Sequence, residues 1–185
     1  MSRGRFAATD WLDLALAELS AHGPDAVKLD AICAAAKLTR GSFYHHFKDH
    51  DRFLVAIARR WQAVHTTDIV NRFEGREPDA ATIDSLNDAV IAIDYRLELG
   101  IREIARRRSA VADVVREADR ARLDLLTTLY TARFGLDRKR AQRFALLEYA
   151  ALAGLILIDP EMPQDEQRVL AGAYDAMVTD HLGRQ

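Results

Sequence analysis

Apolar residues recur every three or four positions along most of the chain, and no segment keeps the alternation of apolar and polar residues that is typical of a strand. Glycine and proline divide the pattern into about nine segments, with breaks at residues 22–24, 74–78, 135–137 and 159–163. Glycine permits a left-handed backbone after a last helical turn, and proline cannot continue a helix. The sequence therefore predicts an all-α protein of about nine helices.

Acidic residues and glycines set the expected helix boundaries. Asp49 and Asp137 stand where a side-chain oxygen can cap the free backbone N–H groups of a first helical turn. We interpret Gly100 and Gly135 as helix ends. The expected ranges are about 9–21, two short helices within 29–47, then 49–73, 83–100, 101–108, 111–134, 138–158 and 163–182.

Residues 29–47 are typical of two short helices joined by a tight turn. Leu29, Ile32 and Ala36 give the first helix one apolar face, and the turn follows at residues 37–38. In the second helix Phe43 and Phe47 are four residues apart and anchor its inner face. This pattern predicts a helix-turn-helix, in which the second helix reads the major groove of DNA.

The outer face of that second helix carries small and hydrogen-bonding residues. Thr39 can cap it, and Arg40 at its start can donate two hydrogen bonds to guanine O6 and N7. The hydroxyls of Ser42 and Tyr44 suit phosphate oxygens, and Gly41 would let the backbone approach DNA closely. An ordinary solvated helix face is the alternative, and the combination of these residue types favours DNA contact.

From about residue 9 to residue 54 the chain resembles the DNA-binding domain of the TetR family of bacterial transcription regulators. The reading helix of that family has a Thr or Ser cap, a glycine two residues later, a tyrosine, and a phenylalanine three residues further on. This chain has Thr39, Gly41, Tyr44 and Phe47 in that register. It departs from the family at Lys28, where Thr is usual, and at His50, where Lys is usual. The resemblance implies DNA contacts from Lys28, Thr39, Arg40, Gly41, Ser42, Tyr44, His45, Lys48 and His50.

Composition and charge fit a cytoplasmic DNA-binding protein. With 49% hydrophobic residues, the 185-residue chain can bury a sizeable core. Residues 1–60 hold nine Lys or Arg against seven Asp or Glu, and the rest holds seventeen against twenty-one, so the positive end is the motif end. Cys33 alone cannot form an intramolecular disulfide, and the polar start does not resemble a signal sequence. The longest apolar run, residues 149–158, is too short to span a bilayer, so we expect a buried helix there and no membrane contact.

We expect two domains, a helix-turn-helix domain at residues 1–48 and a larger helical domain for ligand binding and dimerisation at residues 49–185. The helix at residues 138–158 is apolar around too much of its circumference for one intramolecular neighbour. The resemblance implies that it pairs with a second copy in a four-helix bundle, and a central helix buried within a monomer is the alternative. The expected interface residues are Leu147, Ala151, Gly154, Leu155 and Ile158.

The resemblance also implies an effector pocket in the larger domain. The sequence marks it only by polar or aromatic residues that interrupt apolar helix faces. Each is more often a satisfied buried group or a boundary residue than a ligand contact. A mixed aromatic and acidic lining would suit an amphipathic or cationic organic molecule. The candidates are Trp61, His65, Asp94, Tyr95, Arg122 and Tyr130.

Catalytic and metal sites have no support in the sequence. His46 and His50 have the four-residue spacing of a helical metal pair, but we expect a helix break between Phe47 and Asp49. We find no phosphate-binding glycine loop and no nucleophile with a partnering base. We therefore expect no catalysis, no cofactor and no metal.

Together with the helix-turn-helix pattern, the resemblance implies a homodimeric TetR-like regulator, most simply a repressor, that binds a near-palindromic operator and releases it when a small molecule binds. The alternative is a helical ligand-binding or scaffolding protein whose DNA-binding domain is vestigial. An enzyme would need a metal or cofactor in the purified protein. Operator, effector and regulated genes are not encoded in any recognisable motif.

Overall fold

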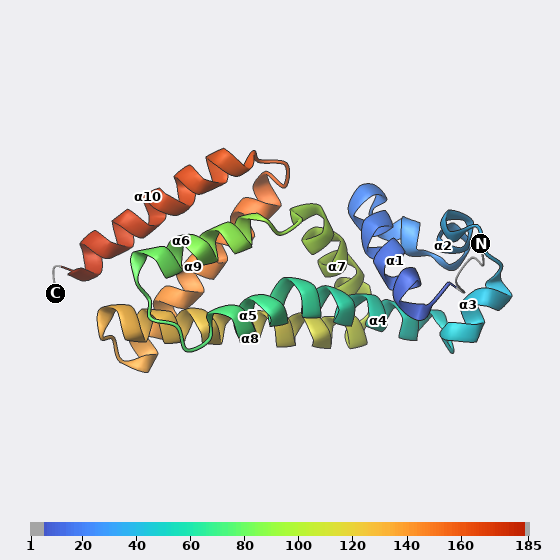
Figure 1. The fold of residues 1–185 in the computed structure, drawn as a ribbon, viewed down its shortest axis with the longest axis horizontal. Coiled ribbons are helices and arrows are strands. Elements are labelled where there is room, and N and C mark those ends of the chain that lie inside the picture. Colours follow the sequence, from blue (N-terminus) through green and yellow to red (C-terminus); the bar gives the residue numbers. More distant parts are fainter. Residues whose placement is uncertain (1–5, 184–185) are drawn as a thin grey trace, which may run out of the picture. The chain divides into compact units, whose positions relative to one another are not determined.

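The computed structural model describes residues 6–183, and within that range every regular element is a helix (Figure 1). The all-α prediction is therefore confirmed. Segments α4, η2 and α5 follow one another without a gap, so together they form the long fourth helix that the sequence predicts. The elements are α1 Ala8–His22, the 3₁₀ turn η1 Pro24–Val27, α2 Leu29–Ala36, α3 Arg40–His46, α4 His50–Gln62, the π-helical turn η2 Ala63–Thr67, α5 Asp68–Phe73, α6 Ala80–Ile91, α7 Tyr95–Arg107, α8 Ser109–Phe134, α9 Arg138–Ile158 and α10 Gln164–Gly183.

Helix ends follow the expected capping chemistry at several places. Asp49 Oδ1 accepts a hydrogen bond from the Arg52 backbone N–H at 2.7 Å, which caps α4. Asp137 caps α9 in the same way, through the Arg140 N–H at 3.0 Å. Gly135, with φ of 64°, follows the last residue of α8. These boundaries are set within one helical turn, and for that reason the sequence predicts them.

The predicted helix end at Gly100 is wrong. The break lies earlier, between Ile91 and Tyr95, and Gly100 is in the interior of α7. A Cβ at this position would lie 2.8 Å from Cδ1 and 2.9 Å from Cγ of Leu19 on α1. Glycine is therefore present because α1 packs closely against α7, and not because a helix stops there.

The described chain forms two compact units. The first consists of the residues up to His65 together with Arg96–Ala118, and the second consists of Thr66–Tyr95 together with the residues from Asp119 onward. The boundary that we expect at residue 48, between a helix-turn-helix domain and a larger helical domain, stays a prediction.

The core of the first unit is aromatic. The Phe43 ring of α3 lies 5.6 Å from Trp11 and 5.0 Å from Phe53 between centroids, both in edge-on geometry. Ile101 of α7 and Val111 of α8 belong to the same buried cluster. The reading helix thus packs against α1 and α4, and α7 and α8 contribute to the same buried cluster.

In the second unit the end of α8, the start of α9 and the end of α10 share one apolar cluster. Tyr130 of α8 stacks on Phe144 of α9 at 5.8 Å, and Ala145 of α9 is fully buried beside them. An ion pair of 2.9 Å between Arg168 and Asp88 joins α10 to α6. The apolar cluster buries one face of the N-terminal part of α9, at Ala141 and Ala145.

The rest of α9 departs from the expectation of a buried helix. By length and composition alone α9 is long and apolar enough to cross a membrane, and one such helix is weak evidence for a membrane span. Only 17% of its most apolar stretch is buried. Leu147 is 61% exposed and Ile158 is 83% exposed. The single chain therefore leaves uncovered an apolar surface that the sequence places inside.

Candidate nucleic-acid interface

The turn between α2 and α3 is built as the sequence predicts. Lys37 follows α2 with φ of 56° and ψ of 37°, a left-handed conformation that glycine usually supplies at a helix C-terminus. The Leu38 N–H donates to the Cys33 carbonyl at 3.0 Å, so the last turn of α2 is closed. The chain then reverses and α3 begins at Arg40.

Capping and burial orient α3. Thr39 Oγ1 accepts a hydrogen bond from the Ser42 N–H at 3.2 Å, which confirms the predicted cap. Phe43 is fully buried and Phe47 is nearly so, while Tyr44 is 51% exposed. Arg40, Gly41 and His45 are also exposed, and Ser42 is half-buried. The side chains that we predict to contact DNA therefore lie on the face opposite to the aromatic anchor.

No steric contact within the described chain requires a glycine at position 41. A Cβ built on it would meet only Thr39 Oγ1, at an ordinary contact distance of 3.6 Å. A glycine in a helix interior costs roughly 1 kcal/mol relative to alanine. Because nothing in the described protein requires the missing side chain, the space above Gly41 is available to a partner.

Two predicted DNA-contacting cations are paired with nearby carboxylates. The Lys28 ammonium lies 2.8 Å from Asp25, and both side chains are exposed. Arg40 contacts Asp30 of α2 through Nε at 2.7 Å and Nη2 at 2.5 Å. The hydrogen bond to Asp30 raises the pKa of Arg40 further, so the guanidinium stays charged. Lys48 is exposed in the turn between α3 and α4.

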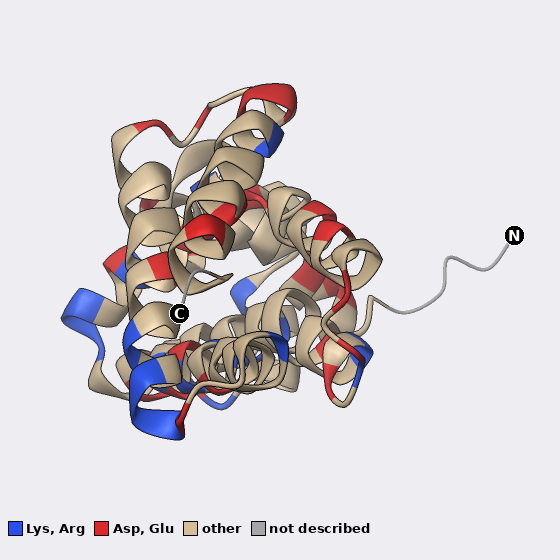
Figure 2. Cartoon of the chain, turned by 90° about the vertical axis from the view of Figure 1, so that its left-hand side faces the viewer, with Lys and Arg blue, Asp and Glu red and all other residues tan. Residues whose placement is uncertain are grey.

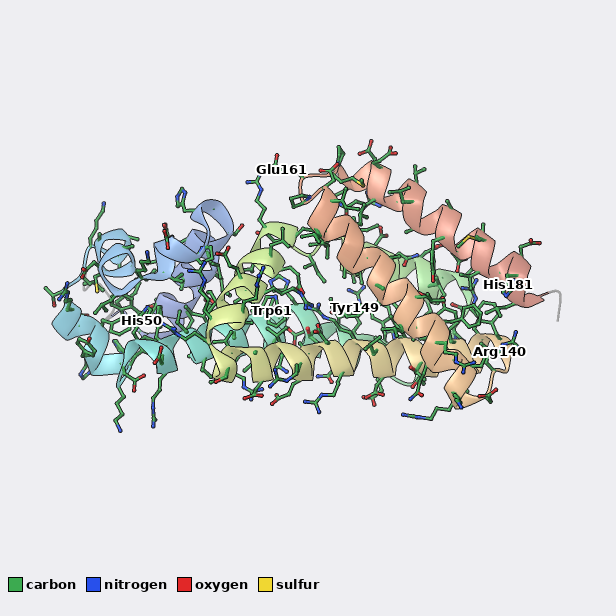
Figure 3. All side chains as sticks on the ribbon, turned by 180° about the vertical axis from the view of Figure 1, so that it is seen from behind. His50, Trp61, Arg140, Tyr149, Glu161 and His181 are labelled. Carbon is green, nitrogen blue, oxygen red and sulfur yellow. The ribbon has the colours of Figure 1, made fainter. Side chains whose placement is uncertain are left out.

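His50, which is labelled in Figure 3, is the first residue of α4, and its side chain is half-buried. Its Nε2 donates to the Val27 carbonyl oxygen at 2.8 Å, so the ring ties α4 to η1. A contact of His50 with phosphate would therefore need a second ring proton, on Nδ1, because a phosphate oxygen only accepts. The expected helix break between Phe47 and Asp49 is confirmed, because α3 ends at His46 and α4 begins at His50.

Lys and Arg residues are interspersed with Asp and Glu residues along the helices (Figure 2). Sequence reasoning missed Asp30 and also Arg108, which follows α7 and pairs with Asp51 of α4 at 3.1 Å. No helical spacing connects Asp30 with Arg40 or Asp51 with Arg108, because each pair joins different segments. Only the tertiary structure brings them together.

The effector candidates are divided between the two compact units. Trp61, whose side chain is fully buried, and half-buried His65 belong to the first compact unit. The other four, Asp94, Tyr95, Arg122 and Tyr130, belong to the second. Tyr95 is 4% exposed, and burial raises the pKa of its phenol.

Arg122 takes part in a polar network of the second unit. Its Nε donates to Thr66 Oγ1 at 3.0 Å, and its Nη1 donates to the Tyr149 hydroxyl at 3.2 Å. The Tyr149 hydroxyl in turn donates to Asp119 at 2.6 Å. Tyr149 is labelled on α9 in Figure 3, on the side that faces α8. We call these four residues, Thr66, Asp119, Arg122 and Tyr149, the arginine network.

Tyr130 belongs to a second polar group in the same unit. Its hydroxyl donates to Glu148 Oε2 at 2.7 Å. Burial raises the pKa of Glu148, and burial together with the nearby carboxylate raises the pKa of Tyr130. Glu148 and Tyr149 interrupt the apolar run of α9, a signal that sequence reasoning could have used and did not.

The expected interface residues occupy one stretch of α9. Leu147, Ala151 and Ile158 are exposed, and Gly154 and Leu155 are half-buried. A Cβ on Gly154 would meet nothing within 4 Å in the single chain. Within residues 6–183 no group of three or more His, Cys, Asp or Glu side chains could hold a metal ion.

Known proteins resemble this chain both in its helix-turn-helix segment and in its whole fold. The sequence profile described as bacterial regulatory proteins, tetR family, matches residues 12–57. A transcriptional regulator (TerR/AcrR family) from Aquifex aeolicus VF5 is 14% identical and superimposes with a TM-score of 0.69, over 92% of this chain and 98% of that one. GusR of Salmonella enterica is 20% identical with a TM-score of 0.69, over 99% of this chain and 98% of its own.

A third solved structure is SmeT, the repressor of the Stenotrophomonas maltophilia multidrug efflux pump SmeDEF. It is 22% identical, with a TM-score of 0.61 over 89% of this chain and 86% of its own. No curated protein matches the chain. The solved structures show the fold, and the profile match covers the helix-turn-helix with its capped reading helix. Residues 12–57 therefore match the helix-turn-helix profile of the TetR family of bacterial regulatory proteins, and the chain as a whole has the fold of the solved regulators that it resembles.

Proposed function

We propose that this protein is a TetR-like, DNA-binding transcription regulator, and that it acts as a homodimeric repressor that binds a near-palindromic operator and releases it when a small organic molecule binds. The observation that carries the proposal is the outer face of α3, where Arg40, Gly41 and Tyr44 are exposed on a helix that is capped at one end and anchored by buried phenylalanines. A rigid helix with polar, small outward residues is the form that major-groove recognition takes.

The contacts divide into two classes. Arg40 reads a guanine, while Tyr44, Lys48 and Lys28 contact phosphates and set affinity for all sequences. The empty space above Gly41 supports a close approach of the backbone to DNA. A mutation in the first class changes the preferred sequence, and a mutation in the second changes affinity and its salt dependence.

Dimerisation is supported by the uncovered apolar face of α9. Exposed Leu147, Leu157 and Ile158 are more apolar surface than one helix of a monomer usually leaves to water. A second copy that pairs through α9 and α10 would cover them and would place two reading heads on two half-sites. Gly154 would permit the close crossing of the paired helices.

The effector would be an amphipathic or cationic organic molecule bound in the second unit. Aromatic rings and carboxylates lie close together there, as Tyr130 and Phe144 do beside Glu148. SmeT is named as the repressor of a multidrug efflux pump, which fits such an effector class. Release follows if the molecule prefers one arrangement of the two heads, and only to the extent of that preference.

Selection of random duplex DNA by the purified protein tests the proposal. We expect a near-palindromic motif, a guanine preference that Arg40→Ala removes, and a uniform loss of affinity in Lys48→Ala with a salt slope that is flatter by about one. A chain that retains no duplex in a sequence-selective way would instead be a ligand-binding or scaffolding protein with a vestigial head. An unchanged motif in Arg40→Ala would refute the base contact.

Gly154→Leu and Leu155→Arg test the dimer separately. A bulky side chain in a close helix crossing, or a charge without a partner, costs several kcal/mol, so both variants should be monomeric by light scattering and should bind a single half-site weakly. An unchanged dimer in both variants would remove α9 from the interface.

A further inference from the structure

Arg40 is already engaged on one side by Asp30. The carboxylate comes from the first turn of α2 and the guanidinium from the first residue of α3, so the contact joins the two helices of the motif. Both Nε and Nη2 of Arg40 lie within hydrogen-bond distance of the same oxygen, Asp30 Oδ1, at 2.7 Å and 2.5 Å. The two side chains are 64% and 72% exposed, so the pair lies on the open surface of the head.

The two Arg40 nitrogens that contact Asp30 determine which N–H donors of the guanidinium remain available to DNA. A guanidinium has five N–H donors in a planar fork. The Nε–H and one Nη2–H form its side edge, and this is the edge that Asp30 occupies. The end edge, formed by Nη1 and the second Nη2–H, points away from the carboxylate. Two parallel donors on that edge match the spacing of guanine O6 and N7.

We propose that Asp30 is a positioning residue for sequence recognition, which holds Arg40 by its side edge so that the end edge reads a guanine in the operator. This inference rests on the proposed function, because it assumes that Arg40 contacts a base. It adds a residue of α2 that touches no base itself and still determines which base is preferred.

Asp30 would affect base preference because an arginine side chain beside DNA can adopt several orientations. An exposed ion pair is weak in water, but DNA that covers the pair excludes water and strengthens it. Without the carboxylate, the guanidinium can turn to a phosphate, which attracts it equally in every sequence. Removal of Asp30 should therefore lower the preference for guanine while total affinity for DNA stays the same or rises, because a negative charge is also lost.

The test compares Asp30→Asn with wild type on duplexes that differ at the one base pair whose preference Arg40→Ala abolishes. A bidentate contact discriminates by roughly 5- to 150-fold between bases. We expect this ratio to fall at least fivefold in Asp30→Asn, with affinity for non-operator DNA unchanged or higher. In an Arg40→Ala background, Asp30→Asn should not change the ratio any further, since there is then nothing to position.

Asp25→Asn is the matched control. It removes the same charge from a carboxylate that is 85% exposed and paired with Lys28 at 2.8 Å, and it lies in the neighbouring η1 turn. It should change affinity for all sequences alike and leave the ratio at the guanine position intact. Asp30→Glu, which restores a carboxylate on a longer side chain, should recover part of the ratio and guards against a loss of ratio through misfolding.

The outcomes separate the inference from the proposed function. If Arg40→Ala abolishes a base preference and Asp30→Asn leaves it unchanged, the positioning role is refuted while the base contact stands. If Asp30→Asn tightens operator binding with the same ratio, Asp30 only competes with DNA for Arg40, and the inference is also refuted. If wild type selects no motif, or Arg40→Ala changes none of its positions, the proposed function fails first and the inference falls with it.

Discussion

Gly100→Ala sets two effects of known size against each other, and the structure decides between them. Replacing glycine by alanine in a helix interior normally stabilises the helix by about 1 kcal/mol. At this position the new Cβ would lie 2.8 Å from Leu19 Cδ1, whereas ordinary carbon contacts are about 3.5 Å or longer. Leu19, or α7 itself, would have to move by about 0.7 Å.

Leu19 has little room for that movement. It is 1% exposed and belongs to the buried cluster that includes Trp11 and Ile101. Overpacking a core of this kind typically costs 1–3 kcal/mol. The larger effect wins, so we expect Gly100→Ala to lower the free energy of unfolding by about 1–2 kcal/mol in spite of its better helix propensity.

Urea unfolding followed by circular dichroism measures the change, with Gly172→Ala as the control. Gly172 lies inside α10, and a Cβ there would meet nothing within 4 Å, so that variant should gain up to about 1 kcal/mol. Leu19→Ala should cost less in the Gly100→Ala background than in wild type, because the methyl group fills the space that the leucine vacates. Equal stabilisation by Gly100→Ala and Gly172→Ala would refute the close approach of α1 and α7.

Three further predictions concern single groups. Asp137→Ala should lower the free energy of unfolding by about 1 kcal/mol through the loss of the α9 cap, while Asp137→Asn should cost only a fraction of that, both measured by urea unfolding. Burial raises the pKa of Glu148, so its protonated carboxyl stabilises the folded state, and this contribution is lost as pH rises through the folded pKa. Glu148→Gln should therefore be more stable than wild type at pH 7. In thermal unfolding below about pH 4 the two proteins should be equally stable. Trp61→Ala should destabilise the fold by about 3–5 kcal/mol, because this side chain is fully buried. His65→Ala is therefore the better probe of effector response. Its operator affinity, measured by fluorescence anisotropy, should stay within about tenfold of wild type.

Local chemistry explains which parts of the fold the sequence predicts. The caps at Asp49 and Asp137 and the glycine at residue 135 act within one turn, so the helices that they bound are found at the expected positions. Gly100 shows where this reasoning fails. Its missing side chain accommodates Leu19, which is eighty-one positions earlier in the chain, and no window of sequence contains both.

The candidate site divides in the same way. The outer and inner faces of α3 follow from helical periodicity and one cap, so exposed Tyr44 and buried Phe43 are placed as expected. The contact between Asp30 and Arg40 depends on how α2 and α3 meet, and periodicity along one helix does not encode it. The effector candidates are the hardest to evaluate from sequence, since the polar partners of Arg122 and Tyr130, which are Thr66, Glu148 and Tyr149, come from other helices.

The arginine network marks the positions at which two helical segments enter the second unit. The segment α4–η2–α5 passes from the first unit to the second at Thr66, and α8 does so at Asp119. Both residues belong to the network, and Arg122 and Tyr149 connect them by hydrogen bonds. Since Thr66 is almost fully buried, any rearrangement that took away its hydroxyl partner would leave a buried polar group unpaired, at a cost of about 1–3 kcal/mol. Coupling free energies between an effector and DNA are typically of that same size. A rearrangement that drew Arg122 away from Thr66 without supplying another partner would therefore cost a free energy of the size that changes an affinity about 5- to 150-fold.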